Sequence, residues 1–339
     1  MENLLGKTLQ ELEGIIQEYR LPLFIARQIA DWLYKKNISS IDAMSNLSIK
    51  SREKIKQHFK IIRNEPVKVQ NSADGTKKYL YHTHDGKLIE TVYIPEKDRA
   101  TLCVSSQVGC KMGCIFCMTG RQGFQANLTA DEIINQISSL PEREQLTNIV
   151  YMGMGEPFDN IGEVMKSLEI LTSGWGFAMS PARITVSTIG IIPGMKRFLK
   201  ETRCHLAVSL HTPFDDERHK LIPVNNINPL KEVLTEIAGF DFDHQRRISF
   251  EYIMFEKFND TSRHIKELLR VLNSIRCRIN LIKFHPIPGS LLKGSDDETI
   301  DIFKKALNTK GIHTTIRQSR GQDICAACGQ LSTKGLSVN

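Results

Sequence analysis

A repeating alternation of strand-like and helical patterns over residues 99–312 constrains the fold more than any other feature. Short runs rich in β-branched residues are each followed by a segment with apolar residues at helical spacing. The repeat is about 30 residues, the size of a strand with its crossover helix. Six such units predict an α/β fold with a parallel sheet, either open or curled into part of a barrel. The strand-like runs are TLCVSS, NIVYMGM, RITVSTIG, HLAVSLH, RISFEYIMF and RINLIKFH. The helical patterns start near Thr129, Ile161, Pro193, Pro229, Thr261 and Asp296.

The segments on either side of this region have different patterns. Residues 1–63 show helical spacing and predict a small helical N-terminal accessory domain. Residues 64–98 alternate, with Asp85-Gly86 between two strand-like runs, which is typical of a β-hairpin. Residues 313–339 predict a last strand and a polar loop that contains CAACGQ.

The composition of the 339 residues excludes several classes of protein. The N-terminus is too polar and acidic for a signal peptide, and no apolar run approaches the roughly 18–20 residues that span a bilayer. We therefore expect a cytoplasmic protein with no membrane partner. A net charge of +7 permits a polyanionic partner without requiring one. The basic stretch at 50–63 fits either a solvated helix face or a contact with a nucleic-acid backbone.

The strongest local signal is GCKMGCIFC, in which Cys110, Cys114 and Cys117 have the spacing C-x3-C-x2-C. Cysteines of a cytoplasmic chain are not expected to form a structural disulfide framework. Three neighbouring thiolates are ligands for an iron–sulfur cluster or for zinc. Zinc would need a fourth cysteine, from Cys103 or from the C-terminal loop, at a separation unlike that of a compact zinc site. A four-iron cluster with three protein ligands would leave one iron open for chemistry.

Chemistry-bearing residues also follow several of the expected strands. In parallel α/β folds the active site lies at the carboxyl ends of the strands. The residues placed there are Cys110, Glu156, Ser187, His211 and His285. In MGMGEP, Gly153 and Gly155 would let the backbone approach a ligand closely. Glu156 would accept hydrogen bonds from a ligand ammonium group.

The cysteine spacing, with Phe116 before the last cysteine, resembles the cluster-binding loop of the radical S-adenosylmethionine superfamily. Further stretches resemble the RlmN/Cfr family of RNA adenine methyltransferases from about residue 88 to residue 331. These stretches are RATLCVSSQVGCKMGCIFCMTG, MGMGEP, VSTIGIIPGM, VSLHTP and DICAACGQL. The resemblance implies a partial (β/α)6 barrel with a helical accessory domain and a hairpin extension. It also implies methylation of carbon 2 of an adenine in 23S rRNA and of the adenosine 3′ of the anticodon in tRNA.

The resemblance assigns cofactors to the matching residues. Cys110, Cys114 and Cys117 would bind a 4Fe-4S cluster. The residues implied to hold S-adenosylmethionine are Gly155, Glu156, Ser187, Ser209, Leu210, His211 and His285. The family uses two molecules of S-adenosylmethionine in each turnover, because carbon 2 of adenine is electron-poor and does not displace a methyl group directly.

The resemblance also assigns the chemistry of the methyl transfer. One cofactor molecule would methylate Cys328, giving S-methylcysteine, and the second would yield a radical that activates this methyl group for addition to the base. Glu90 occupies the position of the family's proposed proton acceptor, and Cys103 could also serve as the base. Cys103 would then release the RNA by forming a transient disulfide with Cys328.

The partners implied are 23S rRNA, tRNA and a flavodoxin-type electron donor, and the protein is expected to be a monomer. Two alternatives stay open. One is Cfr-like methylation of carbon 8 of the same rRNA adenine. The other, from a different class, is a non-catalytic zinc-stabilised RNA-binding protein.

Two residues depart from the family's pattern. His285 stands where asparagine is usual, although histidine can also donate one hydrogen bond and accept another. Cys325 stands where an acidic residue is common, and we hypothesise that it is a bystander. Cys204 and Cys277, beside the fourth and sixth expected strands, are interpreted as small packed side chains.

Overall fold

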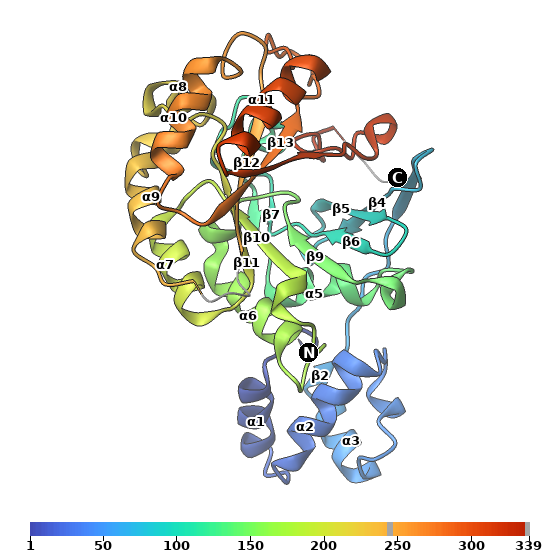
Figure 1. Cartoon of the computed structure of the whole chain (residues 1–339). Coiled ribbons are helices and arrows are strands. Elements are labelled where there is room, and N and C mark those ends of the chain that lie inside the picture. Colours follow the sequence, from blue (N-terminus) through green and yellow to red (C-terminus); the bar gives the residue numbers. More distant parts are fainter. Residues whose placement is uncertain (243–246, 336–339) are drawn as a thin grey trace.

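A ten-stranded mixed sheet forms the centre of the molecule in the computed structural model, which describes residues 1–242 and 247–335 (Figure 1). The strand order is β14-β13-β12-β11-β10-β9-β6-β5-β4-β3. The strands that pair in parallel are β6 (Ala100–Cys103), β9 (Asn148–Tyr151), β10 (Ile184–Thr188), β11 (His205–Ser209), β12 (Ile248–Met254), β13 (Cys277–Lys283) and β14 (His313–Arg317). The first six of these strands confirm the six predicted runs, and β14 confirms the last one.

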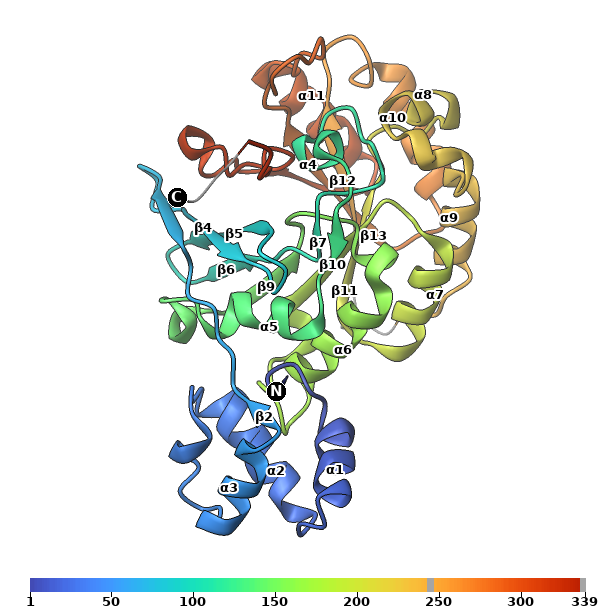
Figure 2. The same cartoon turned by 180° about the vertical axis from the view of Figure 1, so that it is seen from behind.

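Helices connect the parallel strands and lie on the outside of the sheet (Figures 1 and 2). They are α5 (Ala130–Ser138), α6 (Ile161–Thr172), α7 (Ile192–Glu201), α9 (Leu230–Ala238), α10 (Ser262–Leu272) and α11 (Asp297–Thr309). Each begins within one residue of its predicted start. Local capping explains two of these starts: Thr129 and Glu132 form a capping box on α5, and Asp296 accepts a hydrogen bond from the Thr299 amide. The short helices α4 (Met118–Gln122) and α8 (Asp215–Leu221) were not predicted.

The two faces of the parallel sheet differ in polarity. In β10, Ile184 and Val186 are buried towards the helices, whereas Thr185 and Ser187 alternate with them and are partly exposed. Side chains from β6 at one end and β14 at the other line one cavity of about 480 Å³. The parallel sheet is therefore curled into part of a barrel around a polar interior.

The predicted hairpin is confirmed and continues the barrel sheet. β4 (Lys77–His82) and β5 (Leu88–Pro95) pair antiparallel across the turn that contains Asp85 and Gly86. β5 in turn pairs antiparallel with β6, so the hairpin is the edge of the same sheet. A second turn, residues 72–76, joins β4 to β3 (Lys68–Asn71). A short pair of strands, β7 (Gln107–Val108) and β8 (Ala126–Asn127), encloses the cysteine loop.

The N-terminal segment is helical, as predicted, and stands at one end of the barrel (Figure 1). Its helices are α1 (Leu9–Glu18), α2 (Phe24–Ala30) and α3 (Ile49–Lys56), with β1 (Glu2–Asn3) paired parallel to β2 (Phe59–Lys60). In the basic stretch, Lys50 and Lys60 are exposed, but Arg63 turns inward and donates to the carbonyls of Asn37 and Leu33.

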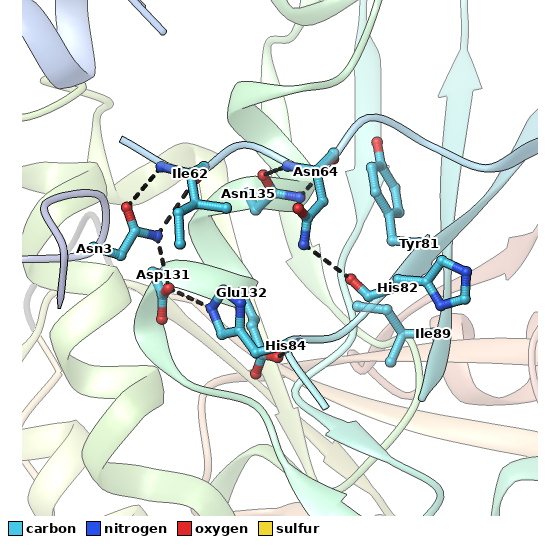
Figure 3. A pocket seen from close by; sticks show the side chains of 10 residues that line it. All are labelled: Asn3, Ile62, Asn64, Tyr81, His82, His84, Ile89, Asp131, Glu132 and Asn135. Atoms are coloured by element: carbon cyan, nitrogen blue, oxygen red, sulfur yellow. Dashed lines mark hydrogen bonds and ion pairs between the residues drawn. The ribbon is translucent and has the colours of Figure 1, made fainter. Parts of the chain in front are cut away.

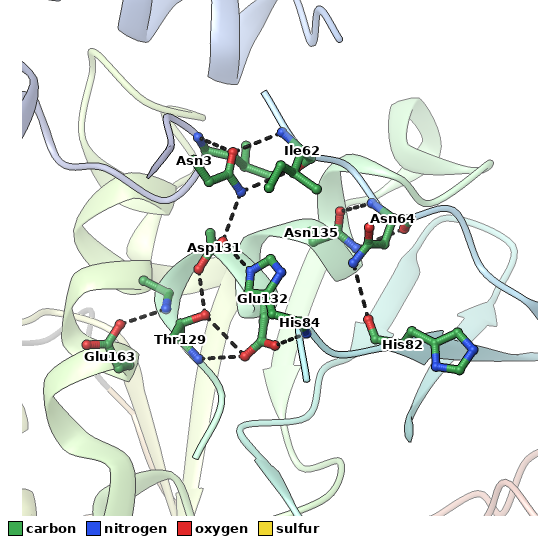
Figure 4. A network of polar contacts seen from close by, with 12 residues as sticks. Asn3, Ile62, Asn64, His82, His84, Thr129, Asp131, Glu132, Asn135 and Glu163 are labelled. Carbon is green, nitrogen blue, oxygen red and sulfur yellow. Dashed lines mark hydrogen bonds and ion pairs between the residues drawn. The ribbon is translucent and has the colours of Figure 1, made fainter. Parts of the chain in front are cut away.

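A polar network, which we call the N-terminal junction, joins this segment to α5 and the β4–β5 turn (Figures 3 and 4). Asn3 donates to Asp131 (2.9 Å), which also contacts His84 Nε2 (2.6 Å). The Asn135 side chain accepts from the Asn64 amide and donates to the Asn64 carbonyl, both at 2.9 Å. The enclosed cavity is only about 10 Å³, the space of about one water molecule.

Candidate active site

The cysteine loop lies beyond the carboxyl end of β6, where the sequence predicted it. Cys110 and Cys114 are buried and Cys117 is partly buried, against an apolar wall that includes Phe255 and Phe284. Burial raises the pKa of all three thiols, that of Cys110 to about 12, and the three sulfurs are close enough to influence one another. Three soft donors in a dry pocket fit an iron–sulfur cluster. No group of three or more His, Cys, Asp or Glu side chains in residues 1–242 and 247–335 converges as a site for a metal ion, so Cys110, Cys114 and Cys117 would have to hold a cluster by their spacing along the loop.

A buried cation that the sequence analysis missed lies beside this loop. Arg218, on α8, is fully buried and donates to the carbonyls of Ile189 (2.6 Å), Ser209 (2.7 Å) and Leu210 (3.2 Å). Burial lowers the pKa of Arg218 to about 10, and the nearby Cys114 opposes that shift. Its charge therefore favours negative ligands in the loop, while its donors hold the ends of β10 and β11. Arg218 stands in DDERHK, three acidic residues followed by three basic ones, and this pattern does not indicate which side chain is buried.

Glu156 is buried at the carboxyl end of β9, and its carboxylate is held by the backbone. One oxygen accepts from the Phe158 amide (3.1 Å) and the other from the Ile189 amide (3.0 Å). Burial raises the pKa of Glu156 to about 7. Each oxygen keeps a lone pair, so the acceptor role predicted for it stays available.

The glycines before Glu156 lie close to another part of the chain. A Cβ on Gly153 would meet the Val104 carbonyl oxygen at 2.7 Å, and one on Gly155 would meet Gln107 at 2.5 Å. These glycines let the loop after β9 pack against the segment that follows β6. Their predicted contact with a ligand stays a prediction.

Residues 209–211, at the carboxyl end of β11, accept hydrogen bonds within the protein through their carbonyls and the His211 ring. Ser209 is partly exposed, and Leu210 is fully buried, with its carbonyl bound to Arg218. His211 has a positive φ of 58° and accepts at Nδ1 from the Ile253 amide (3.1 Å). Burial and Arg218 lower its pKa to about 3, so the ring is neutral, with its proton on Nε2. Its ring packs edge-on against Phe116 of the cysteine loop, at 4.8 Å between centroids.

The barrel cavity brings the other predicted thiols together. Cys328 lines the cavity, and the buried Cys103 lies close enough to influence its sulfur. Arg317 lies beside both thiols and pairs with Glu251 (Nη1 to Oε2, 3.4 Å). Burial, with the nearby Cys328 sulfur, raises the pKa of Cys103 to about 12, against the effect of Arg317. Arg317 and Glu251 were missed, although an acid inside the apolar run ISFEYIM was a usable signal.

His285 faces the same cavity, partly buried, and its Nε2 lies 2.6 Å from Ser319 Oγ. Glu90 is buried on β5, where it pairs with Lys78 (2.8 Å) and accepts from the Ser332 amide (2.9 Å). Ser187 lies on the inner face of β10, beside Ala207 in register. The structure thus separates a cysteine-loop side, with Glu156 and His211, from a cavity side, with His285 and Cys328.

The remaining cysteines lie away from these groups. Cys204 is buried in the main core, and Cys277 is partly buried and packs against it, which confirms their predicted packing. Cys325 is exposed and has a positive φ of 52°.

Comparison with known proteins gives the family. Residues 104–272 match the model of the radical SAM superfamily, and residues 2–61 match the ribosomal RNA large subunit methyltransferase N-terminal domain. The chain is 56% identical over 330 residues to a probable dual-specificity RNA methyltransferase RlmN of Parabacteroides distasonis, covering 97% of this chain and 96% of that protein. It is 40% identical to the dual-specificity RNA methyltransferase RlmN of Nitratiruptor sp., covering 98% of each.

A solved structure agrees with these relatives. A radical SAM methyltransferase from Sphaerobacter thermophilus superposes with a TM-score of 0.90 at 40% identity, covering 98% of this chain and 99% of that one. Fold and site together define the chain as a radical SAM enzyme, a class that uses a 4Fe-4S cluster and S-adenosylmethionine. Within that class, the chain belongs to the RlmN family of RNA methyltransferases. No helix in the described part of the chain is long and apolar enough to cross a membrane.

Proposed function

We propose that this enzyme methylates carbon 2 of an adenine in 23S rRNA and of the adenosine 3′ of the anticodon in tRNA, through S-methylcysteine at Cys328. The observation that carries the proposal is the meeting of three groups at the barrel mouth. Cys328 lies in the cavity, near enough to Cys103 and to Cys117 of the cysteine loop to contribute, after burial, to the raised pKa of both thiols. A methyl carrier needs these neighbours, namely a cofactor site and a resolving thiol.

Cys110, Cys114 and Cys117 would hold the 4Fe-4S cluster. Two molecules of S-adenosylmethionine in each turnover would supply the methyl group and, together with the cluster, the radical that activates it. The residues proposed to hold S-adenosylmethionine are Gly155, Glu156, Ser187, Ser209, Leu210, His211 and His285. A neutral His211 offers an Nε2–H donor, and Glu156 offers acceptor lone pairs. Arg218 offsets the negative charge that thiolate ligands bring into a dry pocket.

Of the two candidate bases, the proposal takes Glu90. A base must be deprotonated before it acts. Burial raises the pKa of the Cys103 thiol to about 12, whereas Glu90 stands in an ion pair with Lys78 at 2.8 Å. In this proposal the proton of adenine carbon 2 passes to Glu90. Cys103, once deprotonated, attacks the sulfur of Cys328. The bond from that sulfur to the RNA-bound carbon breaks, the carbon keeps the electron pair and takes a proton to complete the methyl group, and a disulfide remains between the two cysteines.

The RNA substrate is supported by exposed cations on two parts of the chain. Lys50 and Lys60 are exposed on the N-terminal segment, and Arg99 and Arg320 lie at the cavity. Ammonium and guanidinium groups release counterions from a phosphate backbone, so binding should weaken as salt rises. We further propose a cytoplasmic monomer served by a flavodoxin-type electron donor, whose reductant also restores the thiols from their disulfide.

The test is a single turnover assay with the anaerobically reconstituted protein. It is incubated with S-adenosylmethionine, a low-potential reductant and protein-free 23S rRNA or tRNA, and the digested RNA is compared with 2-methyladenosine and 8-methyladenosine standards by chromatography and mass spectrometry. We expect 2-methyladenosine, and none from a Cys328→Ala variant. 8-Methyladenosine would replace the proposal with carbon-8 chemistry, and zinc in place of iron and sulfide would replace it with a binding protein.

A further inference from the structure

The C-terminal tail, residues 318–335, is attached to the rest of the molecule on both sides of Cys328. On the upstream side it meets the β3–β4 turn, residues 72–76. Asp323 accepts from the Ser72 hydroxyl (2.5 Å) and from the Ala73 amide (3.0 Å). Asp74 accepts in return from the Gly321 amide (2.9 Å). The turn and the tail therefore hold each other through reciprocal aspartates.

A second upstream contact comes from the strand that follows this turn. Lys78 Nζ on β4 donates to the Cys325 carbonyl at 3.3 Å while it pairs with Glu90. The contact is to backbone, so it does not depend on the side chain at position 325. The turn and Lys78 thus fix the tail up to Cys325.

Downstream of Cys328, the tail is attached to the helix of the cysteine loop. The Gly329 carbonyl accepts from the Met118 amide (2.7 Å), and the Leu331 carbonyl accepts from the Thr119 hydroxyl (2.7 Å). The Ser332 amide donates to Glu90. The tail after Cys328 is therefore fixed to the loop that carries the cluster cysteines.

Cys328 lies on the short span between these two attachments. From Cys325 to Gly329 there are four steps of about 3.8 Å, roughly 15 Å of extended chain. The backbone turns at both ends, with positive φ at Cys325 (52°) and Gly329 (81°). In the proposed function the sulfur must meet a cofactor methyl group, an RNA base and Cys103 in turn. A span this short limits its travel to a small volume over the cavity.

We propose that the β3–β4 turn is a positioning element for the methyl carrier, in which Asp323, Ser72 and Asp74 set where the Cys328 sulfur stands. The proposal rests on the proposed role of Cys328. These residues touch neither substrate nor cofactor, and they act through the tail backbone. A displacement of about 1 Å in a reacting group can cost as much as a hundredfold in rate, so weakening one attachment should slow transfer without stopping cofactor cleavage.

The experiment compares Asp323→Ala with Asp85→Ala in the holoenzyme. Asp85 is a matched control, because it lies in the other turn of the same sheet edge and binds Thr83 and Lys87 within that turn. Two products are measured in the same reaction, 5′-deoxyadenosine and methyladenosine. We expect Asp323→Ala to keep 5′-deoxyadenosine within about twofold and to lose methyladenosine by about tenfold. Asp85→Ala should match the wild type in both.

A second measurement separates this proposal from the proposed function. Hydrogen exchange of the tail peptide, without RNA, should speed up in Asp323→Ala and stay unchanged in Asp85→Ala. Unchanged exchange and unchanged product would overturn the positioning role even if the wild type makes 2-methyladenosine. If exchange is faster in Asp323→Ala but the wild type makes no methyladenosine, the contact between turn and tail is supported and the assigned RNA substrate is rejected. If Asp323→Ala fails to fold, Ser72→Ala removes one of the same hydrogen bonds from the other partner. A wild-type ratio of methyladenosine to 5′-deoxyadenosine in Ser72→Ala would then overturn the positioning role.

Discussion

The N-terminal junction and the C-terminal tail are both polar attachments to the barrel, but they mix side-chain and backbone contacts in different proportions. At the junction, a chain of side chains, with Asn3 on Asp131 and Asp131 on His84, stands beside the contacts of Asn135 with the Asn64 backbone in a nearly filled space. Behind them, Leu4 and Leu5 are buried in the main core. The tail is held mainly through its backbone amides and carbonyls, as by Asp74 and Lys78, with one side-chain pair, Asp323 and Ser72.

This difference explains what each attachment tolerates. A contact to a side chain requires a particular residue, whereas a contact to a carbonyl accepts almost any. The tail therefore accommodates Cys325 where the family commonly has an acid, because Lys78 binds the carbonyl there. The junction fixes the N-terminal segment against α5 and the β4–β5 turn. The tail holds the reactive Cys328 between its attachments on the two sides of that residue.

The largest effect is expected at the tail side, from Glu90→Gln. Lys78 and Glu90 are nearly fully buried, with 8% and 3% of their side chains exposed, and removal of one partner leaves a buried charge unpaired. The free energy of unfolding should fall by about 3–5 kcal/mol. Denaturant titration of the reconstituted protein measures this fall.

The double variant Lys78→Met/Glu90→Gln removes both charges and serves as the control. We expect it to recover most of the lost stability while methyladenosine formation stays low, because the variant weakens both tail contacts of this pair and lacks the proposed base. Full recovery of product would show that the pair serves stability alone and would reject Glu90 as the base.

Two glycines sharpen the comparison, one in each attachment. Gly6 has φ +79° and a Cβ there would clash with the Asp131 backbone, while Gly321 has φ +64° and a Cβ there would meet Ala326 at 2.8 Å. The left-handed conformation alone costs an alanine about 1–2 kcal/mol. We expect Gly6→Ala to lower the melting temperature, because the junction joins two packed parts. Gly321→Ala should lower the melting temperature less than Gly6→Ala, because the tail releases the strain by detaching, and it should lower the methyladenosine yield.

Gly86→Ala is the control for backbone strain, since its φ is +77° with open space around it. It should cost stability comparable to the strain alone and leave product formation intact. The comparison would be contradicted by the reverse pattern, in which Gly321→Ala unfolds the protein and Gly6→Ala lowers methyladenosine formation without lowering cofactor cleavage.

The fold was predictable because its signals are periodic. Alternation in RITVSTIG and helical spacing after Thr129 depend on local burial, so the starts of the parallel strands and of their helices were found to within a residue, whereas runs such as NIVYMGM extend past the strand end. Short helices without periodicity, such as α8, were missed. The sheet order was not predictable in the hairpin region, since pairing of β5 with β6 depends on contacts distant in sequence.

The candidate site was predictable only where chemistry leaves a spacing in the sequence. Cys110, Cys114 and Cys117 are such a case, and they lie together. Arg218 and Arg317 lie far in the sequence from the cysteines near which they are buried. No local pattern indicates that they approach these thiols. The glycines of MGMGEP have a second role that the sequence did not indicate, because they also allow a close approach within the protein.

A smaller effect is expected from Asn135→Ala at the junction. Its amide makes two hydrogen bonds to the Asn64 backbone, and their loss leaves two backbone groups without these partners. The cost in free energy of unfolding should be about 1–3 kcal/mol. Cofactor cleavage and its coupling to methyl transfer should not change, unlike in Asp323→Ala. A changed ratio of 5′-deoxyadenosine to methyladenosine would mean that the two attachments are not independent.

The smallest effect is a dependence of the tail on pH. Although burial acts to raise it, the hydrogen bond from the Gly321 amide, with those from Thr76 and Ser72, lowers the pKa of Asp74 to about 2. A folded pKa below the ordinary value of 3.8 means that this stabilisation is present above that value and is lost as the pH falls through about 2. Hydrogen exchange of the tail, corrected for its intrinsic rate, should therefore be constant from pH 5 to pH 8 and should rise only below about pH 4. A rise between pH 5 and pH 8 would place control of the tail in a group other than Asp74.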